Sequence, residues 1–82
     1  MYTLTISGDR DIRAKLAGEI ITNSAGLTTT FVSVVEKVVF HFDYRSNARM
    51  LLRRIAKINN CKPSSCDLLK VENATLTIKK AN

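Results

Sequence analysis

The chain is poor in the residues that build phosphate loops, membrane spans and disulfide frameworks. Its 82 residues include three glycines, one proline, two cysteines, one histidine and no tryptophan. Gly8, Gly18 and Gly26 are scattered, so no glycine-rich loop is available to cradle a phosphate group. No stretch approaches the ~18 consecutive apolar residues of a membrane span, and the start of the chain lacks the basic and apolar regions of a secretory signal. These absences predict a cytoplasmic protein that does not enter a membrane.

The two cysteines and the single histidine are too few for a convincing metal site. Cys61 and Cys66 belong to the stretch CKPSSC, where we expect two free thiols on a loop, although a disulfide could also close so short a loop. A zinc site needs four ligands, so His41 and Asp67 would have to join the two cysteines without a second pair at ligand spacing. We therefore expect no metal and no cofactor.

Catalytic groups are equally scarce. His41 and Asp43 could form a catalytic triad with a nearby serine, but the sequence contains neither a nucleophile turn nor an oxyanion loop. We therefore predict that the protein is not an enzyme and acts by binding.

The first half of the chain predicts one strand followed by one helix. Apolar residues alternate with threonine over 2–6, which is typical of a half-buried strand. Over 10–24 the apolar residues recur at helical spacing, with Asp9 as the expected N-cap and Gly26 as the expected stop. With 45% apolar and 24% charged residues, we expect a globular chain that forms a single domain over 1–82.

The middle of the chain predicts a hairpin and a second helix. Residues 27–35 and 38–44 are rich in β-branched and aromatic side chains and flank Glu36-Lys37, a poor turn pair. Residues 46–59 return to helical spacing, with Ser46 as the expected cap. Residues 59–67 contain Pro63 and predict a loop.

The end of the chain completes a fold of the α+β class. Residues 68–71 and 74–80 predict two short strands around Glu72-Asn73, or one bent strand. The order βαββαβ then predicts a ferredoxin-like sandwich, in which two helices cover one face of an antiparallel sheet. The expected core is Leu4, Ile6, Ile12, Leu16, Phe31, Phe40, Phe42, Leu52 and Ile55. The expected outward face of the sheet is threonine-rich, with Thr3, Thr5, Thr28, Thr30, Thr75 and Thr77.

The positive charge of the chain belongs to one segment. Between Tyr44 and Cys66 there is no acidic residue, and the basic residues are Arg45, Arg49, Arg53, Arg54, Lys57 and Lys62. The other seven of the 13 basic residues balance the seven acidic ones, so this segment accounts for the whole net charge of +6. Because a one-sided field of this kind attracts anions, the six residues are the candidate binding site.

Four of these residues form a ladder along the second helix. Arg45, Arg49, Arg53 and Lys57 are spaced four apart, so each contacts the next on the helix surface. Three like-charged pairs cost about 1 kcal/mol in total, and Arg45 and Arg49 also oppose the helix dipole near its N-terminus. An anionic partner would turn this repulsion into attraction. The alternative is an ordinary solvated surface, with acids of the first helix such as Asp11 or Glu19 alongside the ladder.

The leading hypothesis is a small binding module that contacts the backbone of nucleic acid, or the acidic surface of a nucleoprotein, through these six residues. No base-reading motif accompanies the charge. Phe40 and Phe42 could stack on bases as in RNA-recognition domains, but their alternation directs both into the core.

Two other classes of function stay open. The small size and the lack of catalytic groups also fit an inhibitor or adaptor of a host protein complex, as encoded by phages and mobile elements, including anti-CRISPR proteins. The β-branched stretch 27–35 also suits homodimerisation through an exposed sheet edge.

Overall fold

The computed structural model describes residues 1–24, 27 and 29–81. Three predictions lie outside what is described: Gly26 as a helix stop, Thr28 on the outward face, and the side chain of Phe31 in the core. The described elements follow the predicted order, with the last strand resolved as a hairpin. They are β1 (Tyr2–Gly8), α1 (Arg10–Asn23), β2 (Thr29–Ser33), β3 (Lys37–Phe42), α2 (Arg45–Ile58), β4 (Leu68–Val71) and β5 (Ala74–Lys80).

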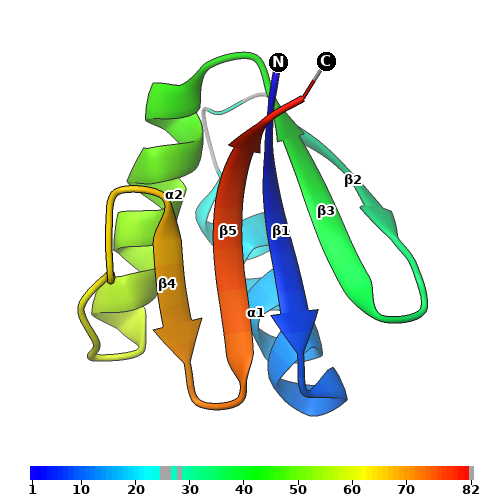
Figure 1. Cartoon of the computed structure of the whole chain (residues 1–82), viewed down its shortest axis with the longest axis vertical. Coiled ribbons are helices and arrows are strands. Elements are labelled where there is room, and N and C mark those ends of the chain that lie inside the picture. Colours follow the sequence, from blue (N-terminus) through cyan, green and yellow to red (C-terminus); the bar gives the residue numbers. More distant parts are fainter. Residues whose placement is uncertain (25–26, 28, 82) are drawn as a thin grey trace.

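The five strands form one antiparallel sheet in the order β2-β3-β1-β5-β4. In Figure 1 the strands lie in front and both helices lie behind them, so the sheet has one covered and one open face. Strands β2, β3, β1 and β5 take the order of a ferredoxin-like sandwich, and β4 adds a fifth strand at the edge. The predicted α+β fold is therefore confirmed.

The core lies between the sheet and the helices. Leu4 and Ile6 of β1 and Phe40 and Phe42 of β3 are fully buried, as the period-two alternation predicts. The helices contribute apolar residues at helical spacing, and Ile12 is only partly buried at the margin. The buried helical residues are Leu16, Ile20, Ala48, Leu51, Leu52, Ile55 and Ala56.

The hairpin between β2 and β3 differs from the prediction. The strands are shorter than expected, and Lys37 belongs to β3, where its carbonyl accepts a 2.9 Å hydrogen bond from the Val34 N–H. Arg13 of α1 supports the turn, because its guanidinium donates to the carbonyls of Val35 and Glu36 at 3.2 and 2.9 Å. This contact from a distant helix compensates for the poor local turn chemistry.

The two helix starts also differ from each other. Asp9 caps α1 as predicted, accepting hydrogen bonds from the N–H groups of Asp11 and Ile12, both at 3.1 Å. The prediction of Ser46 as a cap is wrong. Helix α2 starts one residue earlier than expected, with Tyr44 at the N-cap position and no side-chain capping hydrogen bond.

The end of β1 packs tightly against the β4–β5 turn. Gly8 has φ +113°, a conformation that side-chain-bearing residues rarely adopt, and a Cβ atom there would collide with the carbonyl oxygen of Asn73. The Asp9 N–H donates to that same carbonyl at 3.0 Å. The turn thereby fixes the point at which α1 begins.

Candidate cationic surface

Along helix α2 the four residues of the predicted ladder, Arg45, Arg49, Arg53 and Lys57, change from a position beside the sheet to one in solvent. Successive members lie four residues apart, and four residues rotate about 40° beyond one full turn. Arg45 is half-buried, Arg49 lies at the rim, and Arg53 and Lys57 are exposed. The four residues therefore have different surroundings, and each has to be assessed separately.

Arg45 lies against the sheet rather than in solvent. Its guanidinium carbon is 4.8 Å from the centre of the Tyr2 ring, a cation–π contact. Its Nε atom is buried and has no hydrogen-bond partner among the described residues. Arg45 is thus held in place by β1 and is a poor candidate for a first contact with a partner.

Arg49 has an acidic partner within the chain. Its Nε donates to Oδ1 of Asp67 at 2.8 Å and its Nη2 donates to Oδ2 at 3.1 Å, a bidentate ion pair between α2 and the residue before β4. Hydrogen bonding to Arg49 holds the pKa of the Asp67 carboxyl below its usual value, and the same bond raises the pKa of Arg49. This pair neutralises one member of the ladder.

The other four predicted residues contact no carboxylate in the described part of the chain. Arg54 lies on the flank toward α1, where its Nη1 donates to the Asn23 carbonyl at 2.8 Å, which satisfies one donor and leaves the positive charge uncompensated. Arg53 and Lys57 on α2 and Lys62 on the following loop are exposed. We call these four residues, Arg53, Arg54, Lys57 and Lys62, the helix face.

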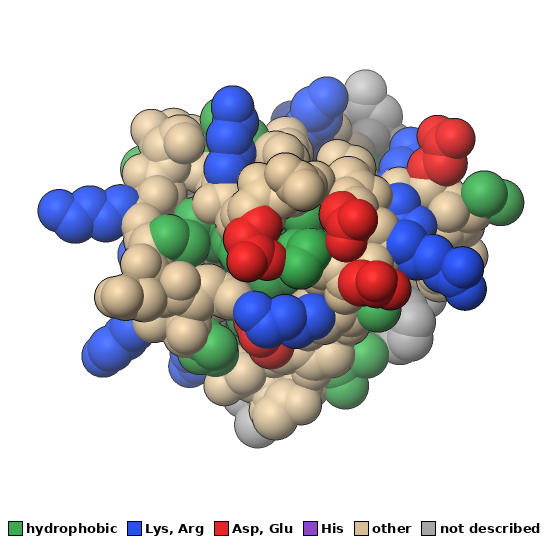
Figure 2. All heavy atoms as spheres, turned by 90° about the horizontal axis from the view of Figure 1, so that it is seen from below, with side chains coloured by type: hydrophobic (Ala, Val, Ile, Leu, Met, Phe, Trp, Pro, Cys, Tyr) green, Lys and Arg blue, Asp and Glu red, His purple; other side chains and the backbone are tan. Residues whose placement is uncertain are grey.

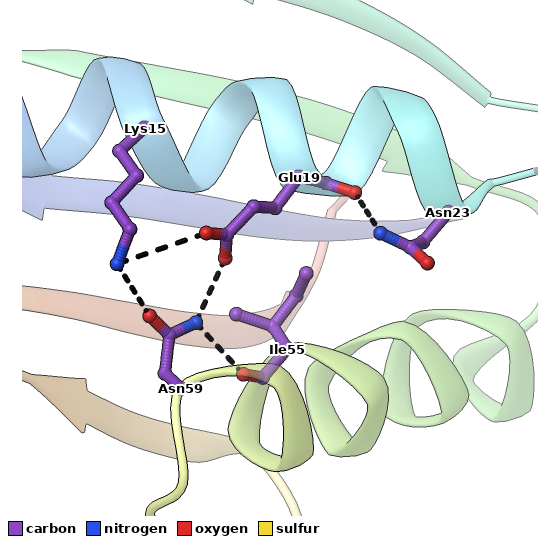
Figure 3. A network of polar contacts seen from close by, with 5 residues as sticks. All are labelled: Lys15, Glu19, Asn23, Ile55 and Asn59. Atoms are coloured by element: carbon purple, nitrogen blue, oxygen red, sulfur yellow. Dashed lines mark hydrogen bonds and ion pairs between the residues drawn. The ribbon is translucent and has the colours of Figure 1, made fainter.

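The acids of α1 do not neutralise the helix face. Figure 3 shows that Glu19 turns instead to Lys15 and Asn59. One carboxylate oxygen lies 3.7 Å from the Lys15 ammonium, and the other accepts from Asn59 Nδ2 at 2.8 Å. Asn59 also donates to the Ile55 carbonyl at 2.9 Å, so this network joins the end of α2 to α1. The predicted alternative, in which Glu19 lies beside the ladder, is not what the structure shows.

Most other acids lie at one end of the molecule, where β1 ends, α1 begins and both hairpins turn. Figure 2 views this end and shows acidic side chains near its centre beside a lysine or arginine, with other cations and a further acid nearer the rim. The acidic residues of these segments are Asp9, Asp11, Glu36 and Glu72. Asp43, the remaining acid, precedes α2 and forms no ion pair with the helix face among the described residues. The helix face therefore keeps its positive charge.

The remaining candidate groups are dispersed. Cys61 is partly buried against the core and Cys66 is exposed, and both are free thiols as expected. No group of three or more His, Cys, Asp and Glu side chains within residues 1–24, 27 and 29–81 could hold a metal ion. Asp67, which a zinc site at the two cysteines would have required, is paired with Arg49.

Phe40 and Phe42 are 0% and 1% exposed, which rules them out as base-stacking platforms. His41, between them, lies on the open face of the sheet, with its Nδ1 atom buried and unpaired among the described residues. Neither described helix is long and apolar enough to cross a membrane.

Sequence reasoning missed the two contacts that occupy Arg45 and Arg49. Asp67 is the first acid after the ladder, so its position was a usable signal, but pairing it with Arg49 requires knowing how the loop returns to α2. Comparison with protein families, with curated proteins and with solved structures finds no match to this chain. Its function is therefore inferred from its own surface.

Proposed function

We propose that this protein is a non-catalytic module that binds the phosphate backbone of nucleic acid through the helix face. The observation that carries the proposal is the excess of positive charge that remains on this surface after ion pairs within the chain are taken into account. Among the described residues no carboxylate contacts Arg53, Arg54, Lys57 or Lys62. Glu19 and Asp67 pair with Lys15 and Arg49 instead, and Asp9, Asp11, Glu36 and Glu72 belong to segments at one end of the molecule. Simple optimisation of a surface helix would have placed glutamates between these residues.

Backbone contact suits this surface better than base recognition. Lysine and arginine side chains neutralise phosphates without reading sequence. The helix face offers no Asn, Gln or aromatic side chain among its four members. Non-specific binding of this kind has Kd values of about 10⁻⁴ to 10⁻⁶ M at physiological salt.

The test is binding to a fluorescent DNA duplex of about 12 base pairs, just over one helical turn. With four phosphate contacts, log affinity should fall against log salt concentration with a slope of about −3.6. The triple variant Arg53→Gln/Lys57→Gln/Lys62→Gln should bind about tenfold more weakly, or worse, because three of the four contacts are lost.

The matched control removes the same charge elsewhere, at the exposed residues Arg10, Lys15 and Lys80. The control variant Arg10→Gln/Lys15→Gln/Lys80→Gln should keep most of the affinity. Equal losses in the two variants would show that only net charge matters, and binding that is undetectable for the unmodified protein would overturn the proposal. Stable capture of a protein partner without nucleic acid would instead favour the inhibitor or adaptor hypothesis.

A further inference from the structure

The face of the sheet that the helices leave open carries a second set of cations. Side chains on this face follow from the strand register, because alternate residues of each strand point to the same side. The covered side takes Leu4, Ile6, Phe40 and Phe42, so their neighbours Thr3, Thr5, Val39 and His41 lie on the open side. The register extends this assignment to all five strands.

The open face consists of three cross-strand rows. The first row is Thr30, His41, Thr3 and Lys79, the second is Val32, Val39, Thr5, Thr77 and Leu68, and the third is Lys37, Ser7, Thr75 and Lys70. None of these residues is acidic. The acids within two residues of a row member in sequence are Asp9, Glu36, Asp43, Asp67 and Glu72; all of them lie in the segments that connect the strands and helices, and Asp67 is paired with Arg49. We call this set of residues the sheet face.

The lysines of the sheet face are spread widely. Lys37 and Lys70 end the same row three strands apart, which places their Cα atoms about 14 Å apart at 4.7–4.9 Å per strand. Lys79 lies four residues along β5 from Thr75 of that row, about 13 Å away. All three lysines are exposed. An extended anion fits such spacing better than a small one, which would reach only one ammonium group at a time.

The other side chains of this face indicate what kind of anion fits. The Thr3 hydroxyl donates to the Lys79 carbonyl at 3.4 Å, whereas the hydroxyls of Ser7, Thr75 and Thr77 can donate hydrogen bonds to phosphate oxygens. No phenylalanine or tyrosine is among the rows, because the aromatic residues of β3 face the core and the Tyr2 ring lies under Arg45. The sheet face can therefore contact a phosphate backbone, and it offers no Phe, Tyr or Trp ring for stacked bases.

The sheet face and the two helices lie on opposite sides of the sheet. The helices lie behind the sheet in Figure 1, which views the molecule along its shortest axis, and the molecule extends 22 Å along that axis. A duplex of one turn is stiff, since its persistence length is about 150 base pairs, so it cannot bend around the protein to reach both faces. Simultaneous use of both faces requires two segments.

We propose that the sheet face is a second contact surface for a nucleic-acid backbone, so that one molecule bridges two segments. This inference rests on the proposed function for its first surface and adds the second. Lys37, Lys70 and Lys79 supply the charge, and the hydroxyls of the rows supply neutral donors.

The test uses two populations of DNA duplex, each of about 12 base pairs, one carrying a donor fluorophore and the other an acceptor. The unmodified protein should bring them together and produce energy transfer. The variant Lys37→Gln/Lys70→Gln/Lys79→Gln should still bind one duplex in an anisotropy assay, but its energy transfer should fall at least about tenfold, because three phosphate contacts are lost. The variant Arg53→Gln/Lys57→Gln/Lys62→Gln, here the helix-face variant, should also lose energy transfer, while keeping weak binding through the sheet face.

The outcomes separate this inference from the proposed function. If the unmodified protein binds duplex through the helix face but gives no energy transfer, the inference that one molecule bridges two duplexes is wrong, and the proposed function stands. Energy transfer that survives in the sheet-face variant also overturns bridging, since it would come from association of protein copies. If energy transfer requires the sheet face but the helix-face variant binds and bridges normally, the proposal that the helix face binds nucleic acid is wrong. The control variant at Arg10, Lys15 and Lys80 should bridge like the unmodified protein.

Discussion

Helices α1 and α2 each have 14 residues and cover the same face of the sheet, but they are stabilised differently. Helix α1 buries few side chains, and local interactions support it: Asp9 caps it, Asp11 suits the positive end of its dipole, and Lys15 pairs with Glu19. Helix α2 lacks a side-chain cap and an acid in its first turn, and it carries a like-charged ladder.

Helix α2 is stabilised instead by the burial of its apolar side chains in the core. Its buried residues form a continuous stripe along the core, and within the described part of the chain the ion pair of Arg49 with Asp67 is the one that links α2 to another segment. A helix that depends on its inner stripe can tolerate unfavourable charges on its outer surface. This difference explains how a small protein can keep an uncompensated cationic surface and remain folded.

The largest expected effect comes from the inner stripe of α2. Leu52 is fully buried, so Leu52→Ala should lower the free energy of unfolding by about 3 kcal/mol through lost burial and the cavity left behind. Ile58, half-exposed on the same helix, is the matched control, and Ile58→Ala should cost about 0.5 kcal/mol or less. Urea unfolding measures both. Similar losses at the two positions would mean that burial is not what holds α2.

The next effect contrasts the two helix starts. Asp9→Ala removes the capping acceptor of two backbone N–H groups and should cost about 1 kcal/mol. Ser46→Ala removes a side chain that makes no capping hydrogen bond and should change stability by less than about 0.5 kcal/mol. The comparison is again made by urea unfolding, and a larger loss for Ser46→Ala would show that α2 is capped after all.

The smallest effect concerns the ion pair of α2 and depends on pH. Because Arg49 holds the pKa of Asp67 below its unfolded value of about 3.9, the pair adds stability that is fully present above that value. This stability is lost as the pH falls through the lower folded pKa. Asp67→Asn should therefore be slightly less stable than the unmodified protein at pH 7, and the difference should shrink toward about pH 2.

Urea midpoints at the two pH values measure this difference. Arg49→Gln should show the same pattern, since it removes the same pair. A difference between Asp67→Asn and the unmodified protein that is equal at both pH values would rule out the ion pair as its source.

Local patterns in the sequence predicted the elements well, because the periods of strands and helices depend on neighbouring residues. The alternation in β1 and the stripe on α2 are examples. The misplaced features depend on contacts between distant segments. The β2–β3 turn is supported by Arg13 of α1, and Arg49 is neutralised by an acid 18 residues away.

The candidate site was therefore only partly predictable. All six predicted residues belong to α2 or its following loop, as expected, but which of them stay available was decided by the fold. The sheet face could not be recognised before the strand order was known, since its three lysines come from β3, β4 and β5 and meet only through the register.

The strand order has a consequence for how the chain folds. β5 is an interior strand of the sheet, between β1 and β4, and Tyr2 of β1 pairs with Lys80 of β5. Before β5 is available, β2, β3 and β1 can pair with one another, but β4 has no neighbouring strand, because it pairs only with β5. Because pairing between segments this far apart in the sequence slows folding, we expect formation of the complete sheet to be a late step that waits for β5.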